Sequence, residues 1–466
     1  MGGIETNYLE NNVGVRQGCT LSPTLFNIFI EELLHRLRNS GIGATLRGSK
    51  ISTLGYADDI VLIADSEIGL QQLLNIVYDY GTEWHVKFSA NKCKVMDFSY
   101  KLATEAIFDE VDNSNDIEFY LGNQILEKTN KIKYLGVTIT DSIDIFGAHK
   151  RNQELCLLQF VGILRNASTR CSNSYRVLRD LWKGMAVPRA MFAAEVLNHT
   201  AGEVKKLEVL QNKVARMALG ANGYIAVAAL KGEMGWSLFQ ERIDKARLLF
   251  KAKLTNMEDS LAASVMNRSR RTVEFNTHSK WHRTLDNLEG RYGIDPEMVY
   301  RRRGWYNEIN KNARDKSTQA WRADVEKKST LQLYKQKKVP ATEKYYLGDL
   351  KSSLLLKART GSLEVRRRTY FLAADRNKNC LHCTQEEETI SHLLLHCALF
   401  DDERRNYQNT ISETIGAQAW VEEKQLADGG LSLLLGFKSS PHPMKIIRLT
   451  KNFLNDIWKK RNKIYL

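Results

Sequence analysis

Two short, mostly apolar runs joined by adjacent aspartates constrain the fold of this chain more than any other feature. Residues 51–57 and 60–64 are separated by Asp58 and Asp59, a pattern typical of a tight β-hairpin with both carboxylates at the turn. Two exposed carboxylates suit a divalent cation such as magnesium, because hard cations bind carboxylate oxygens. For an isolated pair, a solvated acidic turn is the simpler interpretation.

The residues around this hairpin predict an α+β unit. Ser22 is expected to cap a helix that Pro23 begins, and apolar residues then recur at three- and four-residue spacing as far as Leu37. A second helix is predicted over residues 70–80. The alternation of Trp84, Val86 and Phe88 with polar residues predicts a half-buried strand. A strand pair around residues 132–139 is expected to turn at Gly136.

The remainder of the chain is predicted to be mainly helical. Apolar residues recur at helical spacing from residue 145 to about 261. A chain of 466 residues exceeds what one hydrophobic core usually organises. We expect four segments: 1–140, 141–262, 263–375 and 376–466.

Positive charge is concentrated in one part of the sequence. The chain carries 68 Lys and Arg against 54 Asp and Glu, a net charge of +14. Between Met266 and Tyr370 there are 25 basic and 12 acidic residues, so this stretch alone contributes +13. Such a balance favours a polyanion such as nucleic acid or an anionic membrane surface. The aromatic residues interleaved here suit base stacking, but a helical domain with core aromatics explains them better.

Four short motifs in a fixed order resemble those of reverse transcriptases. They are residues 16–26 (RQGCTLSPTLF), residues 56–59 (YADD), Phe88 with residues 91–96 (NKCKVM), and residues 134–136 (YLG). Residues 230–236 (LKGEMGW) resemble the thumb and post-thumb sequence of non-LTR (LINE-type) retrotransposons. Together they give the chain a resemblance to this family from about residue 10 to residue 255.

The resemblance implies a partial polymerase palm, a helical thumb and a role for each motif. Asp58 and Asp59 would hold two magnesium ions for in-line nucleotidyl transfer. The substrate and primer contacts that it implies are Arg16, Gln17, Gly18, Tyr56, Lys92 and Lys94, with Tyr134, Leu135 and Gly136 as the primer grip. A solvated loop lysine is an equally good interpretation of Lys92 or of Lys94 taken singly.

The family's palm has a third carboxylate on a strand that precedes Gln17. Residues 1–15 contain no Asp and no apolar run long enough to form that strand. We therefore expect a truncated copy or a partial gene product that is inactive by itself.

Two arginine clusters are the expected phosphate contacts of the basic segment. They are Arg301, Arg302 and Arg303, followed by Arg366, Arg367 and Arg368. Cations at these positions would bind an RNA template and a DNA primer or target through their phosphates.

Cys380, Cys383, His392 and Cys397 have the spacing C-x2-C-x8-H-x4-C, which predicts a closed tetrahedral structural zinc site. His396 is an alternative to Cys397, and His382 is a weaker one. A third thiolate gives the tighter site, so Cys397 is preferred. The segment resembles the zinc-binding region downstream of non-LTR reverse transcriptases.

No apolar run is long enough to span a bilayer, and residues 1–10 lack the apolar core of a secretory signal. We therefore expect no membrane partner, no secretion, and a place in the nucleus or in a cytoplasmic ribonucleoprotein. The leading functional hypothesis is RNA-directed DNA synthesis. The alternatives are a non-catalytic RNA- or DNA-binding protein from a decayed or domesticated element, and a structural zinc protein. The sequence does not specify the template, the target site or the oligomeric state.

Overall fold

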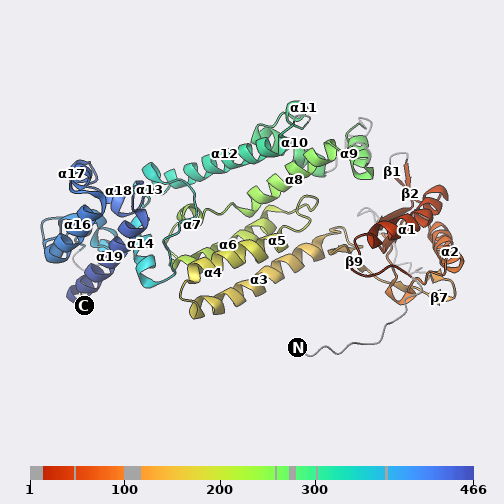
Figure 1. The fold of residues 1–466 in the computed structure, drawn as a ribbon, viewed down its shortest axis with the longest axis horizontal. Coiled ribbons are helices and arrows are strands. Elements are labelled where there is room, and N and C mark those ends of the chain that lie inside the picture. The colour runs from red at the N-terminus through yellow and green to blue at the C-terminus, as the bar shows by residue number, and fades with distance from the viewer. Residues whose placement is uncertain are drawn as a thin grey trace, which may run out of the picture. The chain divides into compact units, whose positions relative to one another are not determined.

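The computed structural model (Figure 1) describes residues 14–46, 49–98, 117–257, 260–271, 280–300, 303–372 and 376–465. The chain divides into two compact units. The first comprises residues 1–149 with 261–276, and the second comprises residues 150–260 with 277–466.

The first unit combines helices with short strand pairs. Its helices are α1 (Ser22–Asn39), α2 (Glu67–Glu83) and α9 (Leu261–Arg271), and a 3-10 turn covers Ala90–Lys92. Its strands are β1 (Ala44–Leu46), β2 (Ser49–Ile51), β3 (Thr53–Tyr56), β4 (Asp59–Leu62), β5 (Lys94–Val95), β6 (Tyr120–Leu121), β7 (Gln124–Ile125), β8 (Glu127–Lys128), β9 (Lys131–Tyr134) and β10 (Val137–Thr140). The pairs β1–β2, β3–β4, β6–β7 and β9–β10 are antiparallel, and β5 pairs with β8 in parallel.

The predicted amphipathic helices form the core of this unit. Leu33 and Leu37 of α1 are fully buried with Leu73 and Tyr80 of α2, because residues three and four apart share one helix face. The predicted cap at Ser22 is wrong. Ser22 is the first residue of α1, and its hydroxyl donates a hydrogen bond to the carbonyl of Arg16 at 2.7 Å.

Both predicted hairpins are present. In the first, Tyr56 pairs with Asp59, so Ala57 and Asp58 make the two-residue turn and Asp59 is the first residue of β4. In the second, Tyr134 pairs with Val137 across Leu135 and Gly136, whose φ angles are 44° and 83°. Positive φ at both central positions matches the twist of the strands, and glycine adopts it without strain.

The predicted strand through Trp84, Val86 and Phe88 is wrong. α2 continues to Glu83, and the amide of Val86 then donates to the carbonyl of Gly81 at 2.8 Å. The Trp84 ring packs at right angles to Phe29, with 5.9 Å between ring centroids. Trp84 also packs on Tyr80 of α2, and Phe88 packs against the core of this unit. The alternation therefore reflects packing on helices and not strand pairing.

The second unit is mainly helical in its described residues. Its helices are α3 (Gly147–Arg170, which begins in the first unit), α4 (Ser174–Leu181), α5 (Val187–Ala190), α6 (Ala201–Leu219), α7 (Val227–Met234), α8 (Phe239–Thr255), α10 (Lys280–Tyr292), α11 (Pro296–Val299), α12 (Trp305–Glu326), α13 (Gln332–Lys337), α14 (Leu350–Arg359), α15 (Arg366–Thr369), α16 (Asp401–Ile415), α17 (Ala417–Gln425), α18 (Leu431–Leu434) and α19 (Pro443–Tyr465). The sequence from residue 145 to 261 is helical as predicted, apart from short connections. No described helix has the length and apolar composition needed to cross a membrane.

One hydrophobic core runs through most of this unit. It joins Trp182 and Leu219 to Tyr334, Leu393 and Ile457, all at most 2% exposed. α4 lies against α6, and α14 lies against α19 (Figure 1). The C-terminal segment therefore shares its core with the helices that follow residue 150.

The motif at residues 230–236 has a packing role in this core. A Cβ atom at Gly232 would lie 2.4 Å from the hydroxyl of Tyr334 and 3.0 Å from the Trp321 ring. Gly235 ends α7 with a φ of 62°. Both glycines are required because the backbone passes too close to its neighbours, or turns too sharply, for a side chain.

A buried charge cluster lies beside this motif. The Arg359 Nε donates to Glu233 Oε1 at 3.1 Å, and both side chains are fully buried. The Tyr346 hydroxyl donates to Glu233 Oε2 at 2.9 Å, and Arg359 also contacts Glu343 and the carbonyl of Leu435. Burial by itself lowers the pKa of Arg359, but the carboxylate of Glu233 holds that pKa well above its ordinary value. The cluster joins α7, α14 and the turn after α18.

We predict that Arg359→Met lowers the free energy of unfolding by about 3–5 kcal/mol, because Glu233 would be left buried and uncompensated. Denaturant unfolding followed by tryptophan fluorescence measures this change. Arg405→Met is the matched control, since Arg405 pairs with Asp402 in an exposed ion pair and its loss should cost under about 1 kcal/mol. Equal losses in the two variants would contradict a stabilising role for the buried cluster.

Candidate catalytic hairpin and metal centre

The turn of the β3–β4 hairpin places two carboxylates in solvent. Asp58 and Asp59 are both exposed, and Tyr56 beside them is 65% exposed. Ala57 has a φ of 53°, which fits the tight turn at some cost for a residue with a side chain. Beneath the hairpin, Gly55 packs directly on the Leu34 side chain of α1. The helix thus fixes the strand that carries the acidic turn.

The segment before α1 forms a second tight turn. The amide of Cys19 donates to the carbonyl of Arg16 at 3.3 Å, and Gly18 has a φ of 85°. This geometry is that of a type II turn, which requires a positive φ at its third residue. Arg16, Gln17 and Gly18 are all exposed. Their side chains and backbone are therefore accessible to a ligand.

The β9–β10 hairpin lies within electrostatic range of the acidic turn. Burial raises the pKa of Tyr134, and the charge of Asp59 adds to the rise. Tyr134 is half-buried while Leu135 at the turn is 40% exposed. Asp59 and Tyr134, far apart in sequence, therefore lie close enough in the first unit to interact electrostatically.

Lys92 and Lys94 lie on either side of Cys93: Lys92 ends the 3-10 turn and Lys94 begins β5. Both are exposed, and the Lys94 Nζ is 2.9 Å from Glu127 Oε1 across the parallel β5–β8 pair. Such an exposed ion pair is weak, so Lys94 can exchange this partner for an anion. The sequence analysis did not predict this contact of Glu127, because only the pairing of β5 with β8 brings Glu127 next to Lys94.

The basic segment is only partly accessible. Arg301 and Arg302 lie outside the described residues, and Arg303 is exposed. Arg367 is exposed and pairs with Glu387, and the Arg368 guanidinium donates to the carbonyl of Gly361 at 3.0 Å.

Arg366 does not suit the phosphate contact predicted for it. It is 8% exposed, and its Nε donates to the carbonyl of Asn377 at 3.1 Å. The reason is that Arg366 begins α15 against the buried carboxylate of Glu388, which accepts its amide at 2.6 Å.

Most described aromatic residues of the basic segment are core residues. Tyr300, Trp321, Tyr334 and Tyr346 are at most 2% exposed, whereas Tyr306 is 56% exposed. This agrees with the preference for core aromatics over a stacking surface.

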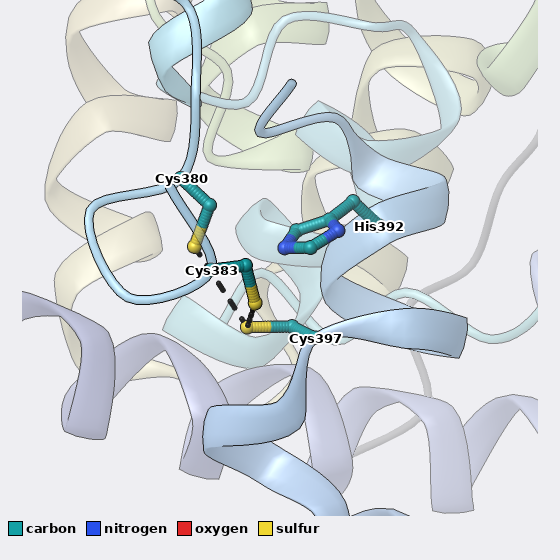
Figure 2. A group of neighbouring side chains, drawn as sticks. All are labelled: Cys380, Cys383, His392 and Cys397. Carbon is teal, nitrogen blue, oxygen red and sulfur yellow. Dashed lines mark hydrogen bonds between the residues drawn. The ribbon is translucent and has the colours of Figure 1, made fainter. Parts of the chain in front are cut away.

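The four predicted zinc ligands come together. Their ligand atoms all lie within 4.8 Å of one another, and Figure 2 shows the His392 ring beside the three sulfur atoms. The Cys397 Sγ is 3.9 Å from Cys380 Sγ and 3.8 Å from Cys383 Sγ. A tetrahedron with zinc–sulfur bonds of about 2.3 Å has edges of about 3.8 Å, whereas a disulfide would bring the sulfurs to about 2.05 Å. The donor set and its spacing fit zinc.

Local structure explains how distant residues reach this site. Cys380 and Cys383 lie on a tight loop in which the Thr384 amide donates to the carbonyl of Cys380 at 2.8 Å. His392 begins a π-helical turn, and the Cys397 amide donates back to the carbonyl of His392 at 2.7 Å. The rivals His382 and His396 are exposed and are not members of the cluster. The geometry therefore favours Cys397 over His396.

The site is held within the protein core. Cys380, His392 and Cys397 are at most 3% exposed. Burial raises the pKa of Cys397, and the neighbouring Cys380 and Cys383 sulfurs raise it further. A cation among the three sulfurs would offset this cost and favour the thiolate form of Cys397.

Two polar contacts around the cluster were not predicted from the sequence. Glu388 is fully buried and accepts hydrogen bonds from the guanidinium of Arg461 at 2.7 Å. This contact joins α19 to the segment between Cys383 and His392, here called the metal-binding loop. Glu386 contacts His392 directly. These pairs are separated by 73 and 6 residues in sequence. No periodicity of a helix or strand predicts contacts at these separations, so only the tertiary fold reveals them.

Comparison with known proteins identifies the class. Residues 3–139 match the family model described as reverse transcriptase (RNA-dependent DNA polymerase). The chain is 34% identical over 130 residues to the Pol polyprotein of the type-2 retrotransposable element R2DM of Drosophila melanogaster, covering 27% of this chain and 12% of that protein. It is 28% identical over 225 residues to that of the type-1 element R2 of Popillia japonica, covering 48% and 35%.

A further relative is the RNA-directed DNA polymerase from the mobile element jockey of Drosophila funebris. It is 24% identical over 259 residues, covering 53% of this chain and 26% of that protein. Residues 3–139 thus form a segment of the reverse transcriptase family, and the relatives that the chain resembles come from non-LTR retrotransposons. The chain spans between about an eighth and a third of the length of these three relatives.

Proposed function

We propose that this chain contributes the YADD part of the polymerase palm, a helical thumb and a zinc-bearing C-terminal segment to RNA-directed DNA synthesis. The observation that carries the proposal is the hairpin turn with Asp58 and Asp59 exposed beside Tyr56, inside the segment that matches the reverse transcriptase family. In this proposal residues 1–140 are palm, 141–262 thumb, 263–375 a nucleic-acid-binding region and 376–466 the zinc segment.

The proposal gives the carboxylates and their neighbours separate tasks. Asp58 and Asp59 would hold magnesium, which stabilises charge on the attacking and leaving oxygens of nucleotidyl transfer. Tyr56, beside the aspartates in sequence, and the turn at Leu135 and Gly136 would support the primer terminus. Arg16, Gln17 and Gly18 would contact the nucleotide, because an exposed turn with glycine admits close backbone approach. Lys92 or Lys94 would neutralise the pyrophosphate.

We predict that primer extension on an RNA template depends on Asp58. The chain alone should not extend a primer, and the chain joined to an upstream segment with the family's first aspartate motif should. Asp58→Asn in the joined protein should lower the rate by at least about 10²-fold, since removing one preorganised electrostatic contact commonly costs that much.

Asp65→Asn is the matched control, because Asp65 is exposed just beyond β4 and should leave the rate unchanged. A joined protein equally active with Asp58→Asn would contradict the catalytic assignment. A joined protein that binds RNA yet never extends a primer would favour a non-catalytic binding protein.

We also propose that Cys380, Cys383, His392 and Cys397 hold one structural zinc ion. The support is the separation of the sulfurs at 3.8 and 3.9 Å and the buried Nε2 of His392, which has no hydrogen-bond partner. A buried unpaired ring nitrogen costs free energy unless a ligand satisfies it.

Metal analysis of the purified chain should therefore find one zinc per molecule, and Cys397→Ser should lose it and destabilise the second unit. His396→Ala should retain the zinc, because His396 is exposed outside the cluster. Zinc retained by Cys397→Ser but lost in His396→Ala would reverse the ligand assignment.

We further propose that the basic segment binds template RNA through Arg301, Arg302, Arg303 and the exposed Arg367. Replacing Arg301, Arg302 and Arg303 by Gln should reduce the slope of log affinity against log salt by about 2, since each single-strand phosphate contact contributes about 0.7. Filter binding of single-stranded RNA at several salt concentrations measures the slope. The control replaces Arg405, Lys459 and Lys463, three exposed cations of the C-terminal segment. The same slope change in both variants would show that no particular surface is used.

A further inference from the structure

The metal cluster has a neighbour outside the four ligands. The Nδ1 of His392 lies 2.7 Å from Glu386 Oε2, within ordinary hydrogen-bond distance. The imidazole is 4% exposed and the Glu386 side chain is 62% exposed. The carboxylate therefore approaches the buried ring from the solvent side.

The two ring nitrogens of His392 are in different environments. Nδ1 has the carboxylate as its partner, while Nε2 is buried and has no hydrogen-bond partner. A neutral imidazole carries one proton, and the carboxylate can only accept, so the proton belongs on Nδ1. Nε2 then presents its lone pair, the form that a metal ligand needs.

The backbone places Glu386 for this contact. The carbonyl of Glu386 accepts a hydrogen bond from the amide of Cys380 at 2.8 Å, and the backbone of the adjacent Glu387 forms an antiparallel β-bridge with Asn379. On the other side, the His392 amide donates to the Thr389 hydroxyl at 3.0 Å. The same short segment thus ties a cysteine ligand by its backbone and the histidine ligand by its side chain.

We propose that Glu386 is the positioning residue of the zinc site. Its carboxylate fixes the Nδ1–H tautomer of His392, holds the ring plane toward the three sulfurs and makes Nε2 a stronger donor. This inference rests on the proposed zinc site. Carboxylate partners of metal-bound histidines commonly contribute about 10- to 100-fold to metal affinity.

The test compares zinc affinity in the full-length chain by competition with a chromophoric chelator, and cobalt(II) absorption in the same proteins. Glu386→Ala should weaken zinc binding about 10- to 100-fold, speed zinc release and alter the visible cobalt bands. Glu386→Gln should weaken it less, because the amide oxygen can still accept from Nδ1–H without the negative charge.

Glu387→Gln is the matched control. Glu387 is the next residue and pairs with Arg367 on the surface, so its replacement should change neither affinity nor cobalt spectrum. A purely structural role for Glu386 would lower thermal stability while leaving both metal readouts at the control values, and that result would overturn the inference.

The failure of the zinc site itself is separately visible. A chain that takes up neither zinc nor cobalt would refute the site and this inference together. Metal that is bound, lost in Cys383→Ser and indifferent to Glu386→Ala would refute the positioning role alone.

Discussion

The second unit depends on a buried ion pair between Arg359 and Glu233. Arg359 and Glu233 are both fully buried, and an unpaired charge in such surroundings is strongly destabilising. Their mutual contact, with Tyr346 and the carbonyl of Leu435 completing it, requires α7, α14 and the turn after α18 to assemble together. The ring of Phe437 lies 4.3 Å from the guanidinium carbon and excludes water from it. Helices with modest individual propensities thereby gain one defined arrangement.

A second buried pair extends this arrangement to the metal-binding loop. Arg461 of α19 meets Glu388, and Glu388 also accepts the amide of Arg366. Cys380, Cys397 and Leu393 belong to the same hydrophobic core as Trp182 and Leu219. The C-terminal segment is therefore part of a larger helical body. Loss of the zinc ion proposed for this segment would therefore also destabilise the helices that share this core, because interiors are close-packed and transmit strain.

The two candidate sites differ in solvent exposure and in ligand type. The carboxylates of Asp58 and Asp59 lie exposed at a turn, where their oxygens are accessible to cations from solvent. The thiols of Cys380 and Cys397 lie buried, and for Cys397 burial opposes the charged form and raises the pKa. An exposed oxygen pair suits a cation that exchanges with substrate, and a buried sulfur set suits one that stays.

The sequence by itself determined the parts whose signal is local. The apolar spacing of α1 and α2, the turn residues of both hairpins, the order of the reverse transcriptase motifs and the Cys/His spacing each depend on residues close in the chain. The strand predicted from the alternation at residues 84–88 is wrong, because Trp84 there packs on a helix. The phosphate contact predicted for Arg366 does not suit its burial, because its backbone amide donates to the buried carboxylate of Glu388. Only the tertiary structure showed that Cys397 is buried within the cluster while His396 is exposed outside it, that Glu233 pairs with Arg359 and that Glu386 contacts His392. The physical reason is that burial and long-range pairing depend on which surfaces meet, and sequence spacing does not encode that.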